Sequence, residues 1–109
     1  MKTIKESDWK FLSELRKTAL DRYCERVLAE IEEVKSDETE NFHQRYRAIY
    51  AIVARRDKEL ALVFDDHRRS TAILEIAALK ARGLLKDDEF IRFSQETRAI
   101  VEAMLENRA

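Results

Sequence analysis

The sequence predicts an all-α protein, and its composition carries the prediction. The 109-residue chain has one glycine and no proline, so almost nothing interrupts the propagation of a helix. A sheet-rich fold of this length would need several tight turns, which draw on both residue types. Leu, Ala, Glu, Lys and Arg, all good helix formers, supply the bulk of the chain. We expect residues 1–109 to form one domain of four to five helices, with two long antiparallel helices packed on a central apolar helix.

The first helix is expected to run from Ser7 or Asp8 to about Lys35. Both residues are good N-caps, and acidic Asp8 also suits the positive end of the helix dipole. Thr3 with Glu6 offers an alternative capping box one turn earlier. The apolar residues recur at three- and four-residue steps. They are Trp9, Leu12, Ala19, Leu20, Tyr23, Val27, Ile31 and Val34, widened by Phe11, Leu15 and Leu28.

A short acidic connection over 35–41 should join this helix to an antiparallel second one, with Ser36, Asp37 or Thr39 available as caps. The second helix is expected from about Glu40 to Phe64. Its apolar stripe comprises Phe42, Tyr46, Ile49, Val53, Leu60 and Phe64, with Tyr50 and Val63 on the flanks.

The sequence 65–67 should end that helix, and Asp66 should cap a third helix from about Arg68 to Arg82. Between positions 70 and 79 only Glu75 is charged, so this helix should be the central one.

Gly83 stands where a left-handed residue is wanted after a helix, and the two leucines that follow it can fold back onto that helix. Asp87 is then expected to cap a short turn, and Ser94 to cap the last helix. The apolar residues of these final segments are Phe90, Ile91, Phe93, Ile100, Val101, Met104 and Leu105.

Charge and cysteine content exclude several classes of protein. Twenty-one basic and 22 acidic residues give a net charge of −1, so no global charge attracts nucleic acid or an anionic membrane. Cys24 is alone and cannot form an internal disulfide, which favours a reducing compartment. The first residues lack an apolar signal stretch, and the longest run without charge, 48–54, is far short of the ~20 residues of a membrane span. We expect a cytoplasmic protein.

Three charged residues occupy positions where the apolar stripes call for apolar side chains. Arg16 shares a face with Leu12 and Ala19, and Arg56 and Asp57 fill the turn between Val53 and Leu60. A charge that faces a core must be paired, because an isolated one costs several kcal/mol. In antiparallel neighbours Arg16 and Asp57 would meet. The hydroxyls that could join their network belong to Tyr23, Tyr46 and Tyr50.

This polar network has three interpretations. Arg16 or Arg56 would bind a carboxylate or phosphate, for which a guanidinium is well suited. Alternatively, Arg16 and Asp57 form a buried pair that fixes helix register, or the long arginine stems reach the surface. The structural pair is the favoured interpretation, because buried ion pairs without a ligand are common.

No metal site or cofactor is expected. Glu40 and His43 have the E-x-x-H spacing of di-iron bundles, but such sites need two pairs and two further carboxylates. His67 is the other histidine, and Phe64 stands where its acidic partner would be. Asp65 and Asp66 next to His67 are better explained as capping residues than as cation ligands.

An enzyme is not expected. Cys24 lies at the edge of the first stripe with no histidine near it in sequence, and it is expected to be a small buried hydrophobe rather than a nucleophile. A glycine-rich phosphate loop cannot form with one glycine.

Nucleic-acid binding through the basic edge at Arg68 and Arg69 is the third functional hypothesis. The helix before Gly83 and the helices after it faintly echo a helix-turn-helix. However, the segment after Gly83 carries Asp87, Asp88 and Glu89, which oppose phosphate, so we expect no strong nucleic-acid interface.

Several short segments carry a resemblance to known proteins. They are Ser7-Asp8-Trp9-Lys10, Leu15-Arg16, Ala19-Leu20-Asp21-Arg22-Tyr23-Cys24, Arg56-Asp57-Lys58-Glu59-Leu60, Phe64-Asp65-Asp66, Arg69-Ser70 and Gly83-Leu84-Leu85. In these segments the chain resembles a set of small bacterial proteins of unknown function. The resemblance implies an all-helical fold and no established activity. The stretch 81–90 also resembles a helical corner found in small bacterial modules, including oligomerisation domains.

The supply of large apolar residues exceeds what one small core can bury. Those in excess include Trp9, Phe11, Leu15, Leu28, Phe42, Tyr50, Phe90 and Phe93. Exposed apolar patches usually mark a partner surface. The leading hypothesis is therefore a non-catalytic interaction or regulatory module that forms a homodimer through its first two helices. This hypothesis leaves room for a further, unidentified protein partner. The second hypothesis is a small-molecule or anion-binding protein that uses Arg16, Arg56 and Asp57.

Overall fold

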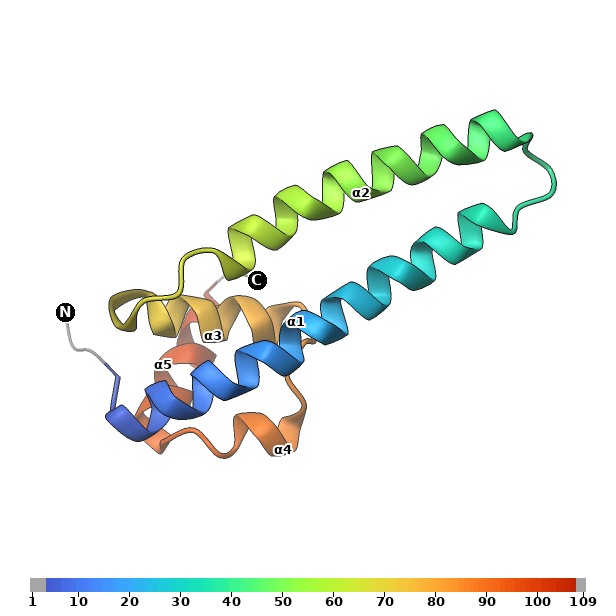
Figure 1. Ribbon diagram of the computed structural model, residues 1–109. Helices are drawn as coiled ribbons and strands as arrows, with labels where there is room; N and C mark the ends of the chain where they lie inside the picture. The colour runs from blue at the N-terminus through green and yellow to red at the C-terminus, as the bar shows by residue number, and fades with distance from the viewer. Residues whose placement is uncertain (1–3, 108–109) are drawn as a thin grey trace.

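Two long helices form an antiparallel hairpin, and three shorter helices pack against one end of it (Figure 1). The computed structural model describes residues 4–107. The elements are α1 (Glu6–Lys35), α2 (Phe42–Phe64), the 3₁₀ turn η1 (Arg69–Thr71), α3 (Ala72–Ala81), α4 (Asp87–Phe90) and α5 (Gln95–Glu106). The described residues contain no strand, so the predicted all-α class is confirmed.

The molecule divides into a head and an arm. The head consists of α3, α4, α5 and the parts of α1 and α2 that pack on them. The arm is the outer part of the hairpin, residues 24–51, between the last buried residue of α1, Tyr23, and the first of α2, Ile52. It projects beyond the head (Figure 1). This projection gives the protein an elongated shape, with principal extents of 53 × 25 × 22 Å. Helix length explains it, because α1 spans about 45 Å and α3 only about 15 Å at 1.5 Å per residue.

The core lies in the head, with α3 at its centre. The apolar side chain of Ile76 is fully buried against the helices on either side. The most deeply buried large side chains of this core are Leu12, Phe64, Ile76, Leu79, Leu84, Phe93 and Val101. The α1 stripe contributes to this core as far as Tyr23, after which α1 has no buried side chain.

The apolar stripe of α2 is exposed along the outer part of the helix. Phe42, Tyr46 and Val53 are exposed, whereas Ile52 and Val63, one step to the side, are buried. The stripe therefore does not mark the buried face along the whole of α2, because the short head helices do not reach the arm.

The starts of α1 and α2 differ from the predicted ones. Helix α1 begins at Glu6 without a side-chain cap, and Ser7 and Asp8 lie within its first turn. The alternative cap Thr3 lies outside the described residues. Asn41 caps α2 in a reciprocal capping box with Gln44, in place of Ser36, Asp37 or Thr39.

The start of the third helix also differs from the expectation. Asp66 does not cap it. Its carboxylate pairs with Arg68, while its carbonyl accepts a bond from the Thr71 hydroxyl. The backbone passes through η1 before α3 begins at Ala72.

Two other termini match the sequence prediction, and one differs. Gly83 has φ +67°, and the bonds Leu84 N–H to Leu79 C=O and Gly83 N–H to Lys80 C=O form a Schellman motif. Ser94 caps α5 by accepting a bond from the Thr97 amide. By contrast, Asp87 is the first residue of α4 rather than its cap.

Candidate functional site

Arg16 pairs with Glu75 of α3 and not with Asp57 as expected. Its Nε donates to Glu75 Oε2 at 3.1 Å, and its Nη2 donates to the carbonyl of Phe64. Asp57 lies two turns before Phe64 on α2 and is exposed. Arg16 thus joins the end of α2 to the centre of α3. The sequence did contain a signal for this partner, because Glu75 is the one charge between positions 70 and 79.

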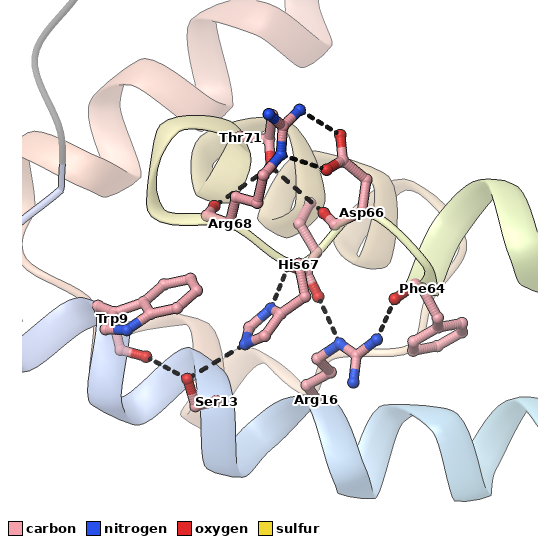
Figure 2. A network of polar contacts seen from close by, with 9 residues as sticks. Trp9, Ser13, Arg16, Phe64, Asp66, His67, Arg68 and Thr71 are labelled. Carbon is pink, nitrogen blue, oxygen red and sulfur yellow. Dashed lines mark hydrogen bonds and ion pairs between the residues drawn. The ribbon is translucent and has the colours of Figure 1, made fainter.

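A histidine extends this first network to the start of α1 (Figure 2). The other carboxylate oxygen of Glu75 lies 2.8 Å from His67 Nδ1, so the tautomer protonated at Nδ1 donates to it. The His67 ring stacks on Trp9 with ring centroids 4.4 Å apart, and its Nε2 lies 3.3 Å from the Ser13 hydroxyl. One face of this ring and both of its nitrogens have protein partners, which favours a structural role.

Arg56 and Tyr23 lie together in a second network, at the base of the arm. The Tyr23 hydroxyl lies 2.7 Å from Glu59 Oε1 and 2.9 Å from the Arg56 carbonyl. The Arg56 guanidinium donates to Glu59 and to Glu30 of α1, both at 3.0 Å, and Arg55 also donates to Glu30.

Burial and the neighbouring carboxylate of Glu59 raise the pKa of Tyr23 to about 12. Hydrogen bonds from Tyr23 and Arg56 lower the pKa of Glu59, so this carboxylate is ionised at neutral pH.

The remaining candidates, Asp57, Tyr46 and Tyr50, are exposed and belong to neither network. The six predicted site residues are therefore split three ways. Arg16 lies in the head, Tyr23, Arg56 and Asp57 lie at the base of the arm, and Tyr46 and Tyr50 lie on the arm itself. Arg56 and Asp57 both line a groove between α1 and α2, whereas Arg16 lies in a different network.

One side of the arm presents an apolar surface that we call the arm face. Its members are Leu28, Ile31, Phe42, Tyr46, Tyr50 and Val53. A groove of about 270 Å³ runs between α1 and α2 on this side, and it is lined by Cys24, Val27, Leu28, Ile31, Val53, Arg56, Asp57 and Leu60. Cys24 was expected to be buried, but it is half-buried in the wall of this groove.

The basic edge at Arg68 and Arg69 is already paired with acidic groups. Arg68 forms a bidentate ion pair with Asp66, and Arg69 donates to Glu6 and to the carbonyl of Ile4. In residues 4–107, no three His, Cys, Asp or Glu side chains gather in a way that would hold a metal ion. The same range contains no helix with the length and apolar character that crossing a membrane requires.

The fold and its networks define a small all-α protein with a projecting hairpin. No family model, curated protein or solved structure matches the chain.

Proposed function

We propose that this protein is a non-catalytic interaction module that acts as a homodimer through the arm face. One observation carries the proposal. An arm of 28 residues, 24–51, contains no buried side chain, yet one of its sides is apolar. Helices in proteins owe most of their stability to the packing of an apolar face. A partner that covers the arm face would supply the missing packing.

The exposed area suits a second copy of the chain. Phe42, Tyr46 and Tyr50 are 82 %, 69 % and 71 % exposed. Aromatic side chains bury roughly 150–250 Å² each, so three such rings offer on the order of 400 Å² per copy. Two copies, together with Leu28 and Val53, reach the roughly 1,000 Å² that a specific interface needs.

The charges beside the arm face favour one orientation of this second copy. Glu25 and Glu32 lie one turn either side of Leu28 on α1, whereas Arg47 and Lys58 flank the α2 edge, and all four are exposed. A two-fold axis along the arm stacks α1 of each copy on α2 of the other. Acidic edges then meet basic edges, and four helices form a bundle with the arms parallel.

The head does not obstruct this arrangement. Arg22 and Arg26 reach the head from α1, donating to the carbonyls of Leu84 and Gly83. By helical spacing they point away from the side of α1 that carries Cys24, Leu28 and Ile31. The arm face is therefore open to a second copy.

Sedimentation velocity tests the proposal. The wild type is expected to sediment as a species of twice the 12.9 kDa chain mass at micromolar concentration. Tyr50→Glu places a charge in the centre of the interface and should give a monomer with an unchanged helix signal. Leu62→Glu is the matched control, because Leu62 is 82 % exposed on α2 outside the arm face. A wild-type monomer at 100 µM, or dissociation caused by Leu62→Glu but not by Tyr50→Glu, contradicts the proposal.

A further inference from the structure

A second feature, on the head side of the arm, is a pocket of about 210 Å³ where α1, α2 and the end of α3 meet. Its lining is dominated by arginine, although nothing in the proposed dimer requires a charged pocket here. The lining residues are Tyr23, Arg26, Val27, Arg56, Glu59 and Arg82. The three arginines come from three different parts of the fold, one at α1, one at α2 and one just after α3.

Arg82 has a nitrogen that its neighbours leave without a partner. Its Nε is buried and makes no hydrogen bond within residues 4–107. The nearest carboxylate oxygen in an ion pair with it is Glu59 Oε2 at 3.9 Å, which is too far for a hydrogen bond. Leaving a buried donor unpaired is unfavourable, and for a charged group especially so. The chain therefore leaves the guanidinium of Arg82 incompletely satisfied, although its Nε is itself closed to solvent.

The pocket also carries an excess of positive charge. Three guanidinium groups line it, from Arg26, Arg56 and Arg82, against one carboxylate, that of Glu59. This carboxylate is already engaged, since it accepts from Tyr23 and Arg56. The local balance is thus two positive charges, in a chain whose net charge is −1.

Two of the three arginines are held in place before any ligand arrives. Arg26 donates to the carbonyls of Arg82 and Gly83 at 2.6 and 2.5 Å, and Arg56 is held by its two carboxylates. A site whose donors are already ordered loses little conformational entropy on binding. Guanidinium groups also match the geometry of phosphate and carboxylate oxygens.

We propose that this pocket binds a small oxyanion with two negative charges, either inorganic phosphate or the phosphate group of a small ester. The guanidinium groups of Arg26, Arg56 and Arg82 supply the donors and the positive charge. A phosphate dianion balances the local excess of two. The pocket shares Val27 and Arg56 with the groove beside the arm face, but none of its lining residues belongs to the arm face, so the site does not depend on dimerisation.

NMR of the arginine Nε–H groups tests this proposal on the intact wild-type protein. Inorganic phosphate and glycerol 3-phosphate are titrated separately at pH 7.5, with chloride holding the ionic strength constant. The Arg82 Nε–H signal is expected to shift saturably with at least one of them, and the tighter of the two identifies the free ion or the ester as the ligand. The proposal is overturned if the Arg82 signal responds to neither probe, or if the Nε–H signal of Arg68 shifts by the same amount.

Three variants separate a built site from general charge attraction. Arg82→Gln should weaken phosphate binding at least tenfold, whereas Arg68→Gln, with the same change in net charge at an exposed pair, should leave it unchanged. Glu59→Gln raises the local excess to three and should tighten binding several-fold. Tyr50→Glu, expected to be monomeric, should bind as the wild type does. Unchanged binding by a folded Arg82→Gln, judged by circular dichroism, contradicts the assignment.

Discussion

Asp8, in the first turn of α1, accepts a 2.6 Å hydrogen bond from the hydroxyl of Ser94, which caps α5 86 positions later in the chain. The same carboxylate accepts from the Ser94 amide at 2.9 Å and from the Thr97 hydroxyl at 2.7 Å. Its side chain is buried. An acid near the start of one helix thus completes the N-terminus of another, where negative charge is also favoured by the helix dipole. This contact ties the two ends of the chain together.

Replacing Asp8 should destabilise the whole head. Asp8→Asn keeps the shape of the side chain but loses the charge and replaces one accepting oxygen with a donor. The expected loss is about 2 kcal/mol in the free energy of unfolding, measured by urea denaturation at pH 7. Ser7→Ala, at the exposed neighbouring position, is the control and should change little. A stability of Asp8→Asn equal to that of the wild type would show that this network contributes nothing.

The role of Asp8 illustrates what the sequence could and could not predict. Local rules favour Asp near a helix start, so Asp8 was assigned to the nearest helix, α1. Its actual partners lie at the other end of the chain, and no local pattern encodes that distance. The capping of α5 by Ser94 and the left-handed conformation of Gly83 depend on neighbouring residues alone, and both predictions are confirmed.

The Arg22–Glu89 pair should make stability depend on pH in the acid range. Arg22 Nη1 and Nη2 donate to the two oxygens of Glu89 at 2.6 and 2.8 Å, which ties α1 to α4. These bonds lower the pKa of Glu89 from 4.5 to about 2. Because the folded pKa lies below the unfolded one, the stabilisation is complete above pH 4.5 and is lost as the pH falls towards 2.

Urea denaturation of Glu89→Gln at several pH values checks this dependence. The variant should be less stable than the wild type by about 2 kcal/mol at pH 7, after allowance for solvent screening, and the difference should shrink between pH 4.5 and 2. Glu102→Gln, an exposed acid on α5, controls for general charge effects. A difference that stays constant across this range would mean that the ionised pair is not its source.

Gly83 is required for its backbone conformation rather than for space. At φ +67° an L side chain is strained, whereas an added Cβ would meet nothing closer than Arg26 Nη2 at 3.5 Å, an ordinary contact. Gly83→Ala should therefore cost about 1 kcal/mol, and Gly83→Asn less, because asparagine tolerates the left-handed region. Thermal denaturation of both variants measures the order of their stabilities. An Asn variant less stable than the Ala variant would point to a steric cause instead.

The division of the predicted site has a physical explanation as well. Helical periodicity correctly placed Arg16 and Tyr23 on the inner face of α1, because periodicity depends only on residues within one helix. The choice of partner depends on where a third helix crosses. For that reason the Arg16–Asp57 pairing was wrong, and the Arg26 and Arg82 pocket was not anticipated. Arg82 follows α3, and the Arg26 guanidinium donates to its carbonyl next to the turn at Gly83.

Hydrogen exchange should reveal whether the arm is stable by itself. No residue in 24–51 is buried in the single chain, whereas Leu79 of α3 is fully buried in the head. Backbone amides exchange through local opening, and an unpacked hairpin opens at much lower cost than a core. If the arm face is covered by a second copy, amides of Leu28, Ile31 and Tyr50 should exchange more slowly as protein concentration rises, whereas that of Leu79 should not change.

Tyr50→Glu should remove the concentration dependence and leave the head amides protected. Arm amides that exchange at the same rate from 1 to 500 µM would contradict self-association and favour an arm that awaits a different partner.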